Sequence, residues 1–490
     1  MNTNNEYNLA LLCDFYELTM GRGYFNSEMK NKIAYFDVFF RRVPDGGGYA
    51  IAAGLEQIIR YIENLHFTES DIDFLRKKNI FDEEFLDYLH NFSFTGDIWA
   101  VPEGTVIFPG EPIMTVRAPA IEAQLIETYV LLAFNHQCLI ATKASRMVRA
   151  AKGRPISEFG SRRAHGEDAA VYGARAAYIG GCSGTACTVS DKLFGVPSGG
   201  TMAHSWVQMF DSEYEAFETY CRLYPNNPTL LIDTYSVFGS GLPNAIRAFK
   251  EVLAPMGLTK CGVRIDSGDI AYITKKVRRL LDEAGLTDCK IIVSNSLDEY
   301  IISEVLSQDA CIDAFGVGER LITAKSDAVF GCVYKLTATE NADGEITPKI
   351  KVSENTAKIT NPHFKKVYRL YDKESGKAEA DLLCLYNEDI DFGKPLEIFD
   401  PEYTWKRRTL TDYTPRELLI PIFKDGRLVY DVPPLQVVKD YCKQEIDSMW
   451  REVLRFENPH NYYVDLSQTL WDLKHDMIAD ARKNKAKGNG

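Results

Sequence analysis

The stretch Gly262-Val263-Arg264-Ile265-Asp266-Ser267-Gly268-Asp269 is typical of a buried strand that ends in a polar glycine turn. The apolar residues that follow, from Ile270 to Leu281, recur at the spacing of one helix face. A strand followed by a helix forms one βα unit, and buried strands of this kind pack beside parallel neighbours. This stretch therefore predicts a parallel α/β fold.

Similar units precede and follow this stretch. Apolar runs at 155–160, 229–233, 290–294 and 312–316 resemble strands, and helical patterns follow at 167–179, 243–253 and 297–306. Repeated βα units build an α/β barrel or a doubly wound sheet. We expect a barrel rather than an open sheet, because the chain has no Gly-x-Gly-x-x-Gly pattern and no obvious point where the strand order reverses.

Changes of pattern divide the chain into three predicted parts. These are an N-terminal α/β domain at 1–135, a barrel catalytic domain at 136–340 and a smaller C-terminal α+β region at 341–490. In the last part we expect strands at 349–352 and 365–371 and a helix from about 437 to 455. We expect the basic end, Lys483 to Gly490, to be disordered and without function.

Composition narrows the classes of function. The 490 residues include 69 acidic and 56 basic ones, a net charge of −13, which disfavours broad nucleic-acid binding. The 11 cysteines form no Cys-x-x-Cys pair and predict reduced, mostly buried thiols in a cytoplasmic protein. The chain shows no secretory segment and no apolar run as long as a membrane span, so we expect no membrane association.

Polar residues follow the predicted strands, where parallel α/β folds bind their ligands. They are Glu158, Asp233, Arg264, Asp266, Asp269 and Ser294, together with the glycines Gly316 and Gly318. Arg264 suits a carboxylate or phosphate, and two aspartates suit Mg²⁺ or sugar hydroxyls. The structural alternative is a helix cap by Ser267 or Asp269 with an internal ion pair.

Two further strand ends offer binding groups. The turn Gly316-Val317-Gly318 exposes backbone N–H groups that could cradle a phosphate, although such glycines often form only a turn. Phe159-Gly160-Ser161-Arg162-Arg163 places an aromatic ring beside guanidinium groups, which suits a flat anionic ring. The alternative there is a core phenylalanine with surface arginines.

The glycine-rich stretch Gly199 to Trp206 contains His204, one of 8 histidines in the chain. A histidine at such a turn could transfer protons, act as a nucleophile, or simply hydrogen-bond a neighbouring carbonyl. The chain lacks a Walker phosphate loop, His-Glu-x-x-His, Gly-x-Ser-x-Gly and any metal-spaced Cys/His set. A Walker loop therefore does not hold ATP, if ATP is used.

Six strings in this order resemble nicotinate phosphoribosyltransferases, which are type II phosphoribosyltransferases, over nearly the whole chain. The strings are Asp14-Phe15-Tyr16-Glu17-Leu18-Thr19-Met20, Ala141-Thr142-Lys143-Ala144, Glu158-Phe159-Gly160-Ser161-Arg162-Arg163, Gly200-Thr201-Met202-Ala203-His204-Ser205, Arg264-Ile265-Asp266-Ser267-Gly268-Asp269 and Val333-Tyr334-Lys335-Leu336.

The resemblance implies an N-terminal α/β domain packed on an irregular barrel, in a homodimer whose active sites lie at the subunit interface. It implies that nicotinate and 5-phosphoribosyl-1-pyrophosphate give nicotinate mononucleotide and pyrophosphate, with Mg²⁺ present. ATP is then a co-substrate whose hydrolysis is coupled through a phosphohistidine. This reaction is the first step of NAD salvage from nicotinate.

The resemblance also assigns residues. His204 matches the phosphorylated histidine and forms the predicted catalytic set with Asp266 and Arg264. Predicted substrate contacts are Tyr16 (reaching the partner subunit's site), Phe159, Arg162, Thr201, Ser205, Asp233, Arg264, Asp269, Ser294, Gly316, Gly318 and Thr323. Asp266 and Asp269 are the candidate metal ligands, acting through magnesium pyrophosphate.

One position in the sequence bears on the choice between nicotinate and nicotinamide. Nicotinamide-specific relatives carry an aspartate where this chain places Ala186, and a carboxylate there would repel nicotinate. The alternatives are a relative that uses nicotinamide or quinolinate, and a non-catalytic barrel that senses a phosphorylated metabolite.

Overall fold

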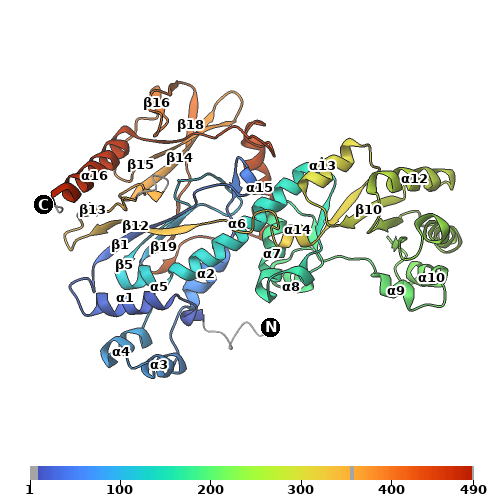
Figure 1. The fold of residues 1–490 in the computed structure, drawn as a ribbon, viewed down its shortest axis with the longest axis horizontal. Coiled ribbons are helices and arrows are strands. Elements are labelled where there is room, and N and C mark those ends of the chain that lie inside the picture. Colours follow the sequence, from blue (N-terminus) through green and yellow to red (C-terminus); the bar gives the residue numbers. More distant parts are fainter. Residues whose placement is uncertain (1–8, 354–357, 488–490) are drawn as a thin grey trace. The chain divides into compact units, whose positions relative to one another are not determined.

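The structure is a computed structural model that describes residues 9–353 and 358–487. Its ribbon is shown in Figure 1. The chain forms two compact units, one from residues up to 139 together with those from 329 onward, and one from residues 140–328. Helix α6 (Glu127–Ala150) crosses the first of these boundaries. The three-part division at residues 135 and 340 stays a prediction.

The first unit contains, among its described residues, a 7-stranded sheet in the order β13-β12-β1-β5-β3-β19-β20. Its strands are β1 (Ile33–Phe39), β3 (Asp97–Ala100), β5 (Met114–Pro119), β12 (Val333–Glu340), β13 (Ile346–Pro348), β19 (Ile420–Lys424) and β20 (Arg427–Leu428). The central β1 pairs with β5 and β12 in antiparallel fashion and is largely buried. N-terminal strands (β1, β3 and β5) and C-terminal strands (β19 and β20) therefore share one sheet. This sheet also includes β12, which ends the predicted 136–340 domain.

Smaller sheets complete this unit. A 4-stranded sheet of described residues has the order β18-β14-β15-β21, and two further sheets are pairs. The strands are β14 (Lys365–Asp372), β15 (Ala378–Leu385), β18 (Tyr413–Glu417), β21 (Val464–Leu466), β16 (Leu396–Phe399) with β17 (Arg407–Leu410), and β2 (Ala50–Ile51) with β4 (Val106–Ile107). The helices that accompany these sheets are α1 (Phe15–Phe25), α2 (Leu55–Asn64), α3 (Glu69–Arg76), α4 (Glu83–His90), α5 (Ala120–Leu125), α15 (Leu435–Ser448) and α16 (Gln468–Lys487).

Three sequence predictions for the C-terminal region need correction. Residues 349–352 are not a strand, because β13 ends at Pro348 and is followed, in the described chain, by a single backbone hydrogen bond, from the Lys349 N to the Thr337 carbonyl of β12. Helix α15 ends at Ser448, since the buried Met449 takes an extended conformation. The basic tail is helical in α16 as far as Lys487, and residues 488–490 lie outside the described residues.

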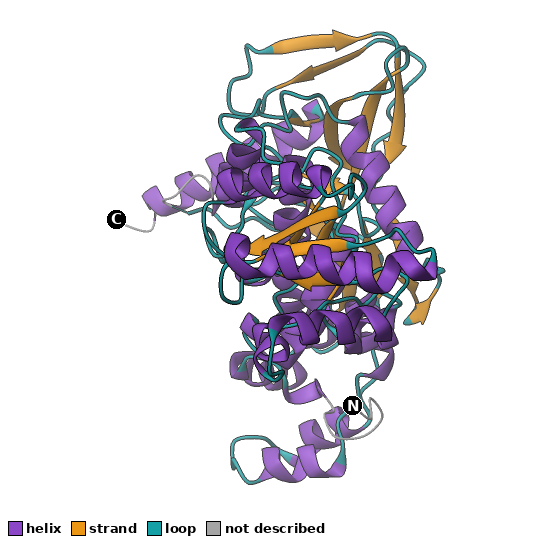
Figure 2. Ribbon diagram, turned by 90° about the vertical axis from the view of Figure 1, so that its right-hand side faces the viewer, coloured by secondary structure: helices purple, strands orange, loops and turns teal. Residues whose placement is uncertain are grey.

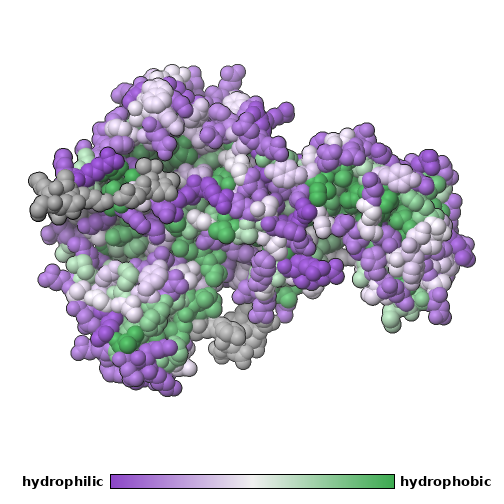
Figure 3. All heavy atoms as spheres, in the orientation of Figure 1, coloured by the Kyte–Doolittle hydropathy of each residue, from purple (hydrophilic) through white to green (hydrophobic). Residues whose placement is uncertain are grey.

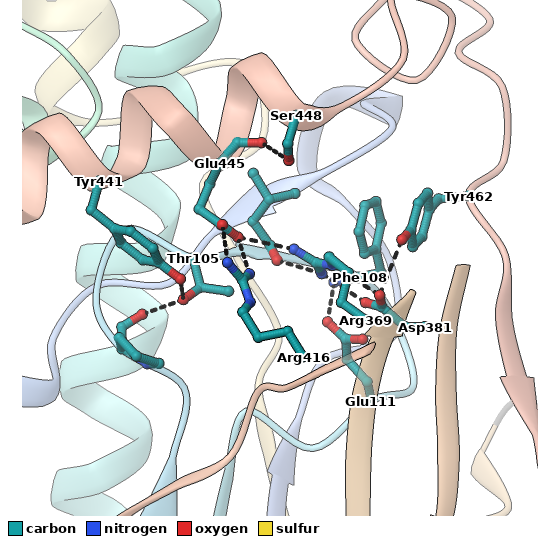
Figure 4. Close-up of polar contacts among 12 residues, drawn as sticks. Thr105, Phe108, Glu111, Arg369, Asp381, Arg416, Tyr441, Glu445, Ser448 and Tyr462 are labelled. Atoms are coloured by element: carbon teal, nitrogen blue, oxygen red, sulfur yellow. Dashed lines mark hydrogen bonds and ion pairs between the residues drawn. The ribbon is translucent and has the colours of Figure 1, made fainter. Parts of the chain in front are cut away.

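A cluster of charged side chains is buried inside this unit (Figure 4). Arg369 is fully buried and pairs with Asp381 at 2.6 Å and with Glu445 at 3.1 Å, and Glu445 also pairs with Arg416. Burial raises the pKa of Glu111 well above its ordinary range, and the neighbouring Asp381 carboxylate adds to this. The raised pKa favours the protonated form of Glu111, beside the carboxylates of Asp381 and Glu445 and the guanidinium groups of Arg369 and Arg416.

Glu111 should make the stability of the protein depend on pH. Because its folded-state pKa is raised, the folded protein keeps a proton that the unfolded chain releases above about pH 4.5. The free energy of unfolding should therefore fall as the pH rises toward the folded-state pKa. Glu111→Gln cannot release this proton, so the variant should lose less stability between pH 5 and pH 8 than the unmodified protein.

Urea unfolding of both proteins across this range measures the difference. Glu63→Gln, which changes an exposed carboxylate on α2, is the matched control and should follow the unmodified protein. Parallel pH profiles for Glu111→Gln and the unmodified protein would contradict a buried proton at Glu111.

The second unit is a parallel α/β unit, as the sequence predicts. Within residues 140–328, all of which are described, a 6-stranded parallel sheet has the order β7-β6-β11-β10-β9-β8. Its strands are β6 (Ile156–Glu158), β7 (Gly184–Thr185), β8 (Thr229–Leu231), β9 (Gly262–Ile265), β10 (Lys290–Asn295) and β11 (Ala314–Val317). Its helices are α7 (Glu167–Ile179), α8 (Thr188–Phe194), α9 (His204–Gln208), α10 (Glu213–Leu223), α11 (Leu242–Ala248), α12 (Ile270–Glu283), α13 (Glu299–Ser307) and α14 (Glu319–Ile322).

Helices cover this sheet, as Figure 2 shows in a view from the right-hand side of Figure 1. The core joins Val277 and Leu281 of α12 to Leu231, Val263 and Ile291 of three neighbouring strands. No strand pairing within residues 140–328 joins β7 to β8, so closure into a barrel is not confirmed.

The face drawn in Figure 3 is largely hydrophilic and carries several apolar patches. In the described part of the chain, no helix combines the length and apolar character that crossing a membrane requires.

Candidate active site

The C-terminal ends of β8 and β9 bring Asp233 and Asp266 together. Asp233 Oδ2 accepts hydrogen bonds from the backbone N of Asp266 at 2.9 Å and from Ser267 Oγ at 2.7 Å. Asp266 Oδ1 in turn accepts from Ser294 Oγ at the end of β10. Three strand ends predicted from the sequence thus form one polar network.

Asp269 differs from its neighbours, because it caps helix α12. Its Oδ1 accepts from the backbone N of Tyr272 at 2.8 Å, which is the structural role that the sequence left open for this residue. Its side chain is exposed, and its second carboxylate oxygen has no hydrogen bond within this cap. Helix capping therefore uses Oδ1 of Asp269, and Oδ2 takes no part in the cap.

One nitrogen of the Arg264 guanidinium group is hydrogen-bonded and another has no partner in the described chain. Its Nη1 donates to Thr201 Oγ1 at 2.5 Å, whereas its buried Nε has no hydrogen-bond partner among the described residues. Burial lowers the pKa of Arg264; Asp266 and Asp233 oppose this shift and Arg162 adds to it. A buried guanidinium edge without a partner is costly unless a ligand pairs with it.

His204 opens α9 and lies between two of these loops. Its Nδ1 is 3.1 Å from Thr234 Oγ1, and its Nε2 is 3.9 Å from Asp266 Oδ2. The imidazole ring is therefore held by the Thr234 side chain rather than by a neighbouring backbone carbonyl. With 41% of the side chain exposed, the ring remains accessible to a ligand.

Phe159 lies over the end of β11. A Cβ atom added to Gly316 would lie 2.5 Å from Cδ2 of the Phe159 ring, so only glycine permits this contact. The Phe159 ring is half-buried, and the buried Glu158 stabilises the backbone on either side of it. Glu158 Oε2 accepts a hydrogen bond from Thr185 Oγ1, and Oε1 accepts one from the Gly160 N–H. Gly316 therefore serves close packing at this site, in addition to any role toward a phosphate.

The remaining predicted residues lie on several other elements. Gly318 precedes α14, and Thr323 follows it, donating its hydroxyl to the Glu319 carbonyl at 2.8 Å. Arg162 is exposed near Arg264, and Ser205 is exposed beside His204 on α9. Tyr16 belongs to the other unit, on α1, where 43% of it is exposed and burial raises its pKa.

Comparison with known proteins accounts for this arrangement. Models of the N-terminal domain, the family and the C-terminal domain of nicotinate phosphoribosyltransferase match residues 11–135, 155–373 and 364–474. A nicotinate phosphoribosyltransferase of Bacillus subtilis is 42% identical over 474 residues, covering 97% of this chain and 96% of that protein. The chain belongs to the nicotinate phosphoribosyltransferase family.

The resemblance drawn from six sequence strings is thereby confirmed. A crystal structure of human nicotinic acid phosphoribosyltransferase has a TM-score of 0.83 at 26% identity and covers 95% of this chain and 99% of its own. A nicotinate-nucleotide pyrophosphorylase structure from Pyrococcus furiosus has a TM-score of 0.69 at 22% identity, which shows a shared fold alone.

Sequence reasoning missed two contributors to this nicotinate phosphoribosyltransferase site. Thr234, next to Asp233, contacts the imidazole of His204, and Thr185 braces Glu158. Thr234 directly follows the predicted strand at 229–233 and could have been found by extending the strand-end search by one residue, whereas no strand was predicted beside Thr185. Among the described residues, no three His, Cys, Asp or Glu side chains are grouped so that they could hold a metal ion.

Proposed function

We propose that this protein transfers a phosphoribosyl group from 5-phosphoribosyl-1-pyrophosphate to nicotinate, forming nicotinate mononucleotide and pyrophosphate in NAD salvage. The observation that supports this best is Arg264, whose buried Nε lacks a partner beside Thr201 and Asp266. A planar carboxylate is the natural partner for such a guanidinium edge. Ala186, exposed at the end of β7, puts no carboxylate at the position that the family resemblance links to nicotinamide.

The chemistry of a pyridine ring fits these residues. The ring nitrogen attacks the anomeric carbon while pyrophosphate leaves, and the sugar gains positive charge on the way. The nitrogen loses no proton, so the reaction needs no general base. The protein then contributes mainly positioning and charge placement: Phe159 offers a ring face, Arg264 holds the carboxylate, and Asp233 and Asp266 face the positive sugar.

In this scheme His204 is free to accept the phosphoryl group of ATP. Its imidazole nitrogen attacks the terminal phosphorus of ATP, ADP leaves, and water later hydrolyses the phosphohistidine to phosphate. Thr234 orients the ring through Nδ1, and Asp266 lies toward Nε2. Thr323, Gly316 and Gly318 are the proposed contacts of the phosphoribosyl and phosphate groups.

Magnesium is proposed with the pyrophosphate. Asp233 Oδ1 is buried without a partner, and Asp266 and Asp269 lie on the adjacent loop, so carboxylate oxygens of the kind that Mg²⁺ prefers are present. When bound, Mg²⁺ would neutralise the leaving pyrophosphate. Since the protein offers no three-residue metal cluster among its described side chains, phosphate oxygens and water would complete the coordination.

We also propose that the parallel sheet curls into an incomplete barrel. The segment from Ser198 to His204 supports this. Ser198 bridges to Thr185 of β7, Thr201 accepts from Arg264 of β9, and His204 contacts Thr234, which follows β8. This segment spans the gap where a strand would close the barrel. The free cysteines throughout the described chain support a reducing, cytoplasmic location.

A homodimer with shared sites is the proposed assembly. The exposed apolar residues Leu12, Phe15, Tyr16 and Met20 around α1 support it, because apolar groups at a surface often mark an interface. If Tyr16 completes the partner's site, subunits carrying Tyr16→Ala and His204→Ala should complement each other. Each mixed dimer then contains one intact site, and an equal mixture should regain about a quarter of the ATP-stimulated rate.

The measurement compares each variant alone with a refolded or exchanged mixture at the same total concentration. A mixture no more active than the mean of its parents would mean that Tyr16 and His204 do not act across an interface.

The proposed function is tested by turnover on three pyridines. With 5-phosphoribosyl-1-pyrophosphate and Mg²⁺, nicotinate should release pyrophosphate steadily, whereas nicotinamide and quinolinate should be at least tenfold slower, a difference of about 1.4 kcal/mol. Faster turnover of nicotinamide would reassign the substrate. Absence of pyrophosphate release with every pyridine would favour a non-catalytic, metabolite-binding barrel.

A further inference from the structure

Two cysteines occupy matching positions at the start of neighbouring strands. Gly262 of β9 pairs with Lys290 of β10, and Cys261 and Cys289 directly precede these residues. The backbone N of Lys290 donates to the Cys261 carbonyl at 3.0 Å, so the register extends to the two cysteines. Adjacent strands lie about 4.8 Å apart, within the roughly 4.4–6.8 Å between Cα atoms that a disulfide tolerates.

The two thiols also influence each other's ionisation. A hydrogen bond from the Cys289 thiol lowers the pKa of Cys261, and the nearby charge of Arg278 lowers it further. The same contact raises the pKa of Cys289. Arg278 is held in place by donating to the Cys289 carbonyl at 2.7 Å. Cys261 is therefore the more nucleophilic sulfur, with Cys289 in position to react with it next.

The pair lies just below the surface, at the end of the strands remote from the candidate active site. Cys261 is 2% exposed and Cys289 1%, but the residues that precede them, Thr259 and Lys260 in one loop and Thr287 and Asp288 in the other, are exposed. Access of a small oxidant to the thiols therefore requires movement of one of these surface loops. Neither thiol takes part in the proposed transfer reaction.

We propose that Cys261 and Cys289 form a redox-active pair that peroxides convert reversibly into a disulfide. The Cys261 thiolate attacks one peroxide oxygen, the O–O bond breaks, and a sulfenic acid forms as hydroxide leaves. The Cys289 sulfur then displaces the sulfenic oxygen as hydroxide, and its proton completes a water molecule. Two thiols lose two electrons in total, and one hydrogen peroxide becomes two waters.

The disulfide would join the two ends of the segment from residue 261 to residue 289, which contains β9 and α12. This segment includes Arg264, Asp266 and Asp269. A cross-link there limits the freedom of the unfolded chain more than that of the folded one. Oxidation should therefore raise the melting temperature, and a dithiol reductant should reverse the rise.

The test treats the folded, full-length protein with hydrogen peroxide, blocks free thiols and maps tryptic peptides by mass spectrometry. The expected product links the peptide Cys261–Arg264 to the peptide Leu280–Lys290 and disappears after dithiothreitol. Full alkylation of both cysteines after peroxide, or oxidation of Cys261 without a cross-link, would overturn the proposal. This measurement needs no variant, so loss of folding cannot obscure it.

Variants sharpen the assignment. Cys261→Ser and Cys289→Ser should each lose the cross-link and the rise in melting temperature. Cys221→Ser removes a buried thiol on α10 whose pKa is raised by burial and by the nearby Cys261, and it should keep both. A cross-link between Cys221 and Cys261 in the unmodified protein would overturn the pairing. Pyrophosphate release in the absence of oxidant tests the proposed transferase function separately.

Discussion

His204→Ala is expected to abolish the stimulation of catalysis by ATP while sparing a slow basal transfer. The imidazole is the nucleophile proposed for ATP, and alanine offers no atom that can accept a phosphoryl group. The ratio of rates with and without ATP should fall to about one. Positioning of nicotinate should persist, because Arg264, Phe159 and Asp233 do not depend on His204 for their contacts.

Label transfer measures this directly. Protein incubated with γ-³²P-labelled ATP should carry an acid-labile label at His204, and the variant should carry none. His165→Ala, which changes an exposed histidine in the same unit, is the matched control and should keep both label and stimulation. Undiminished stimulation by ATP in His204→Ala would refute the phosphohistidine role.

Arg264→Ala should weaken nicotinate more than any other single substitution of a binding residue. Removing one partner of a buried charge pair costs about 3 kcal/mol, which corresponds to a rise of roughly 100-fold in KM. Nicotinamide carries no carboxylate and should lose far less, so discrimination between the two pyridines should shrink. Arg264→Lys should be intermediate, since an ammonium group lacks the planar fork of a guanidinium.

Steady-state kinetics on nicotinate and nicotinamide measure both effects. Arg222→Ala removes an exposed arginine that pairs only across one turn of α10, and it should change neither KM. Because Arg264 also bonds to Thr201, the melting temperature of the variant must be compared with that of the unmodified protein. An unchanged preference for nicotinate would mean that its carboxylate is bound elsewhere.

Most of the parallel unit could be predicted from local sequence. The predicted helix at 167–179 coincides with α7, and the predicted strand at 262–266 coincides with β9 to within one residue. Such elements follow from apolar periodicity over a few residues, which is written in the chain itself. The prediction of a strand at 349–352 was wrong, because a strand needs a pairing partner as well as a local apolar pattern.

Sequence by itself determined which residues stand at the strand ends and, through six strings, the family to which the chain belongs. Only the tertiary structure decided which of those residues meet. Asp233 bonds to the Asp266 loop, Thr234 holds His204, and Cys261 faces Cys289, because strand order and register bring distant segments together. The joining of β12 to β1 has the same cause: pairing across some 300 residues depends on the closure of the whole fold, which no local pattern encodes.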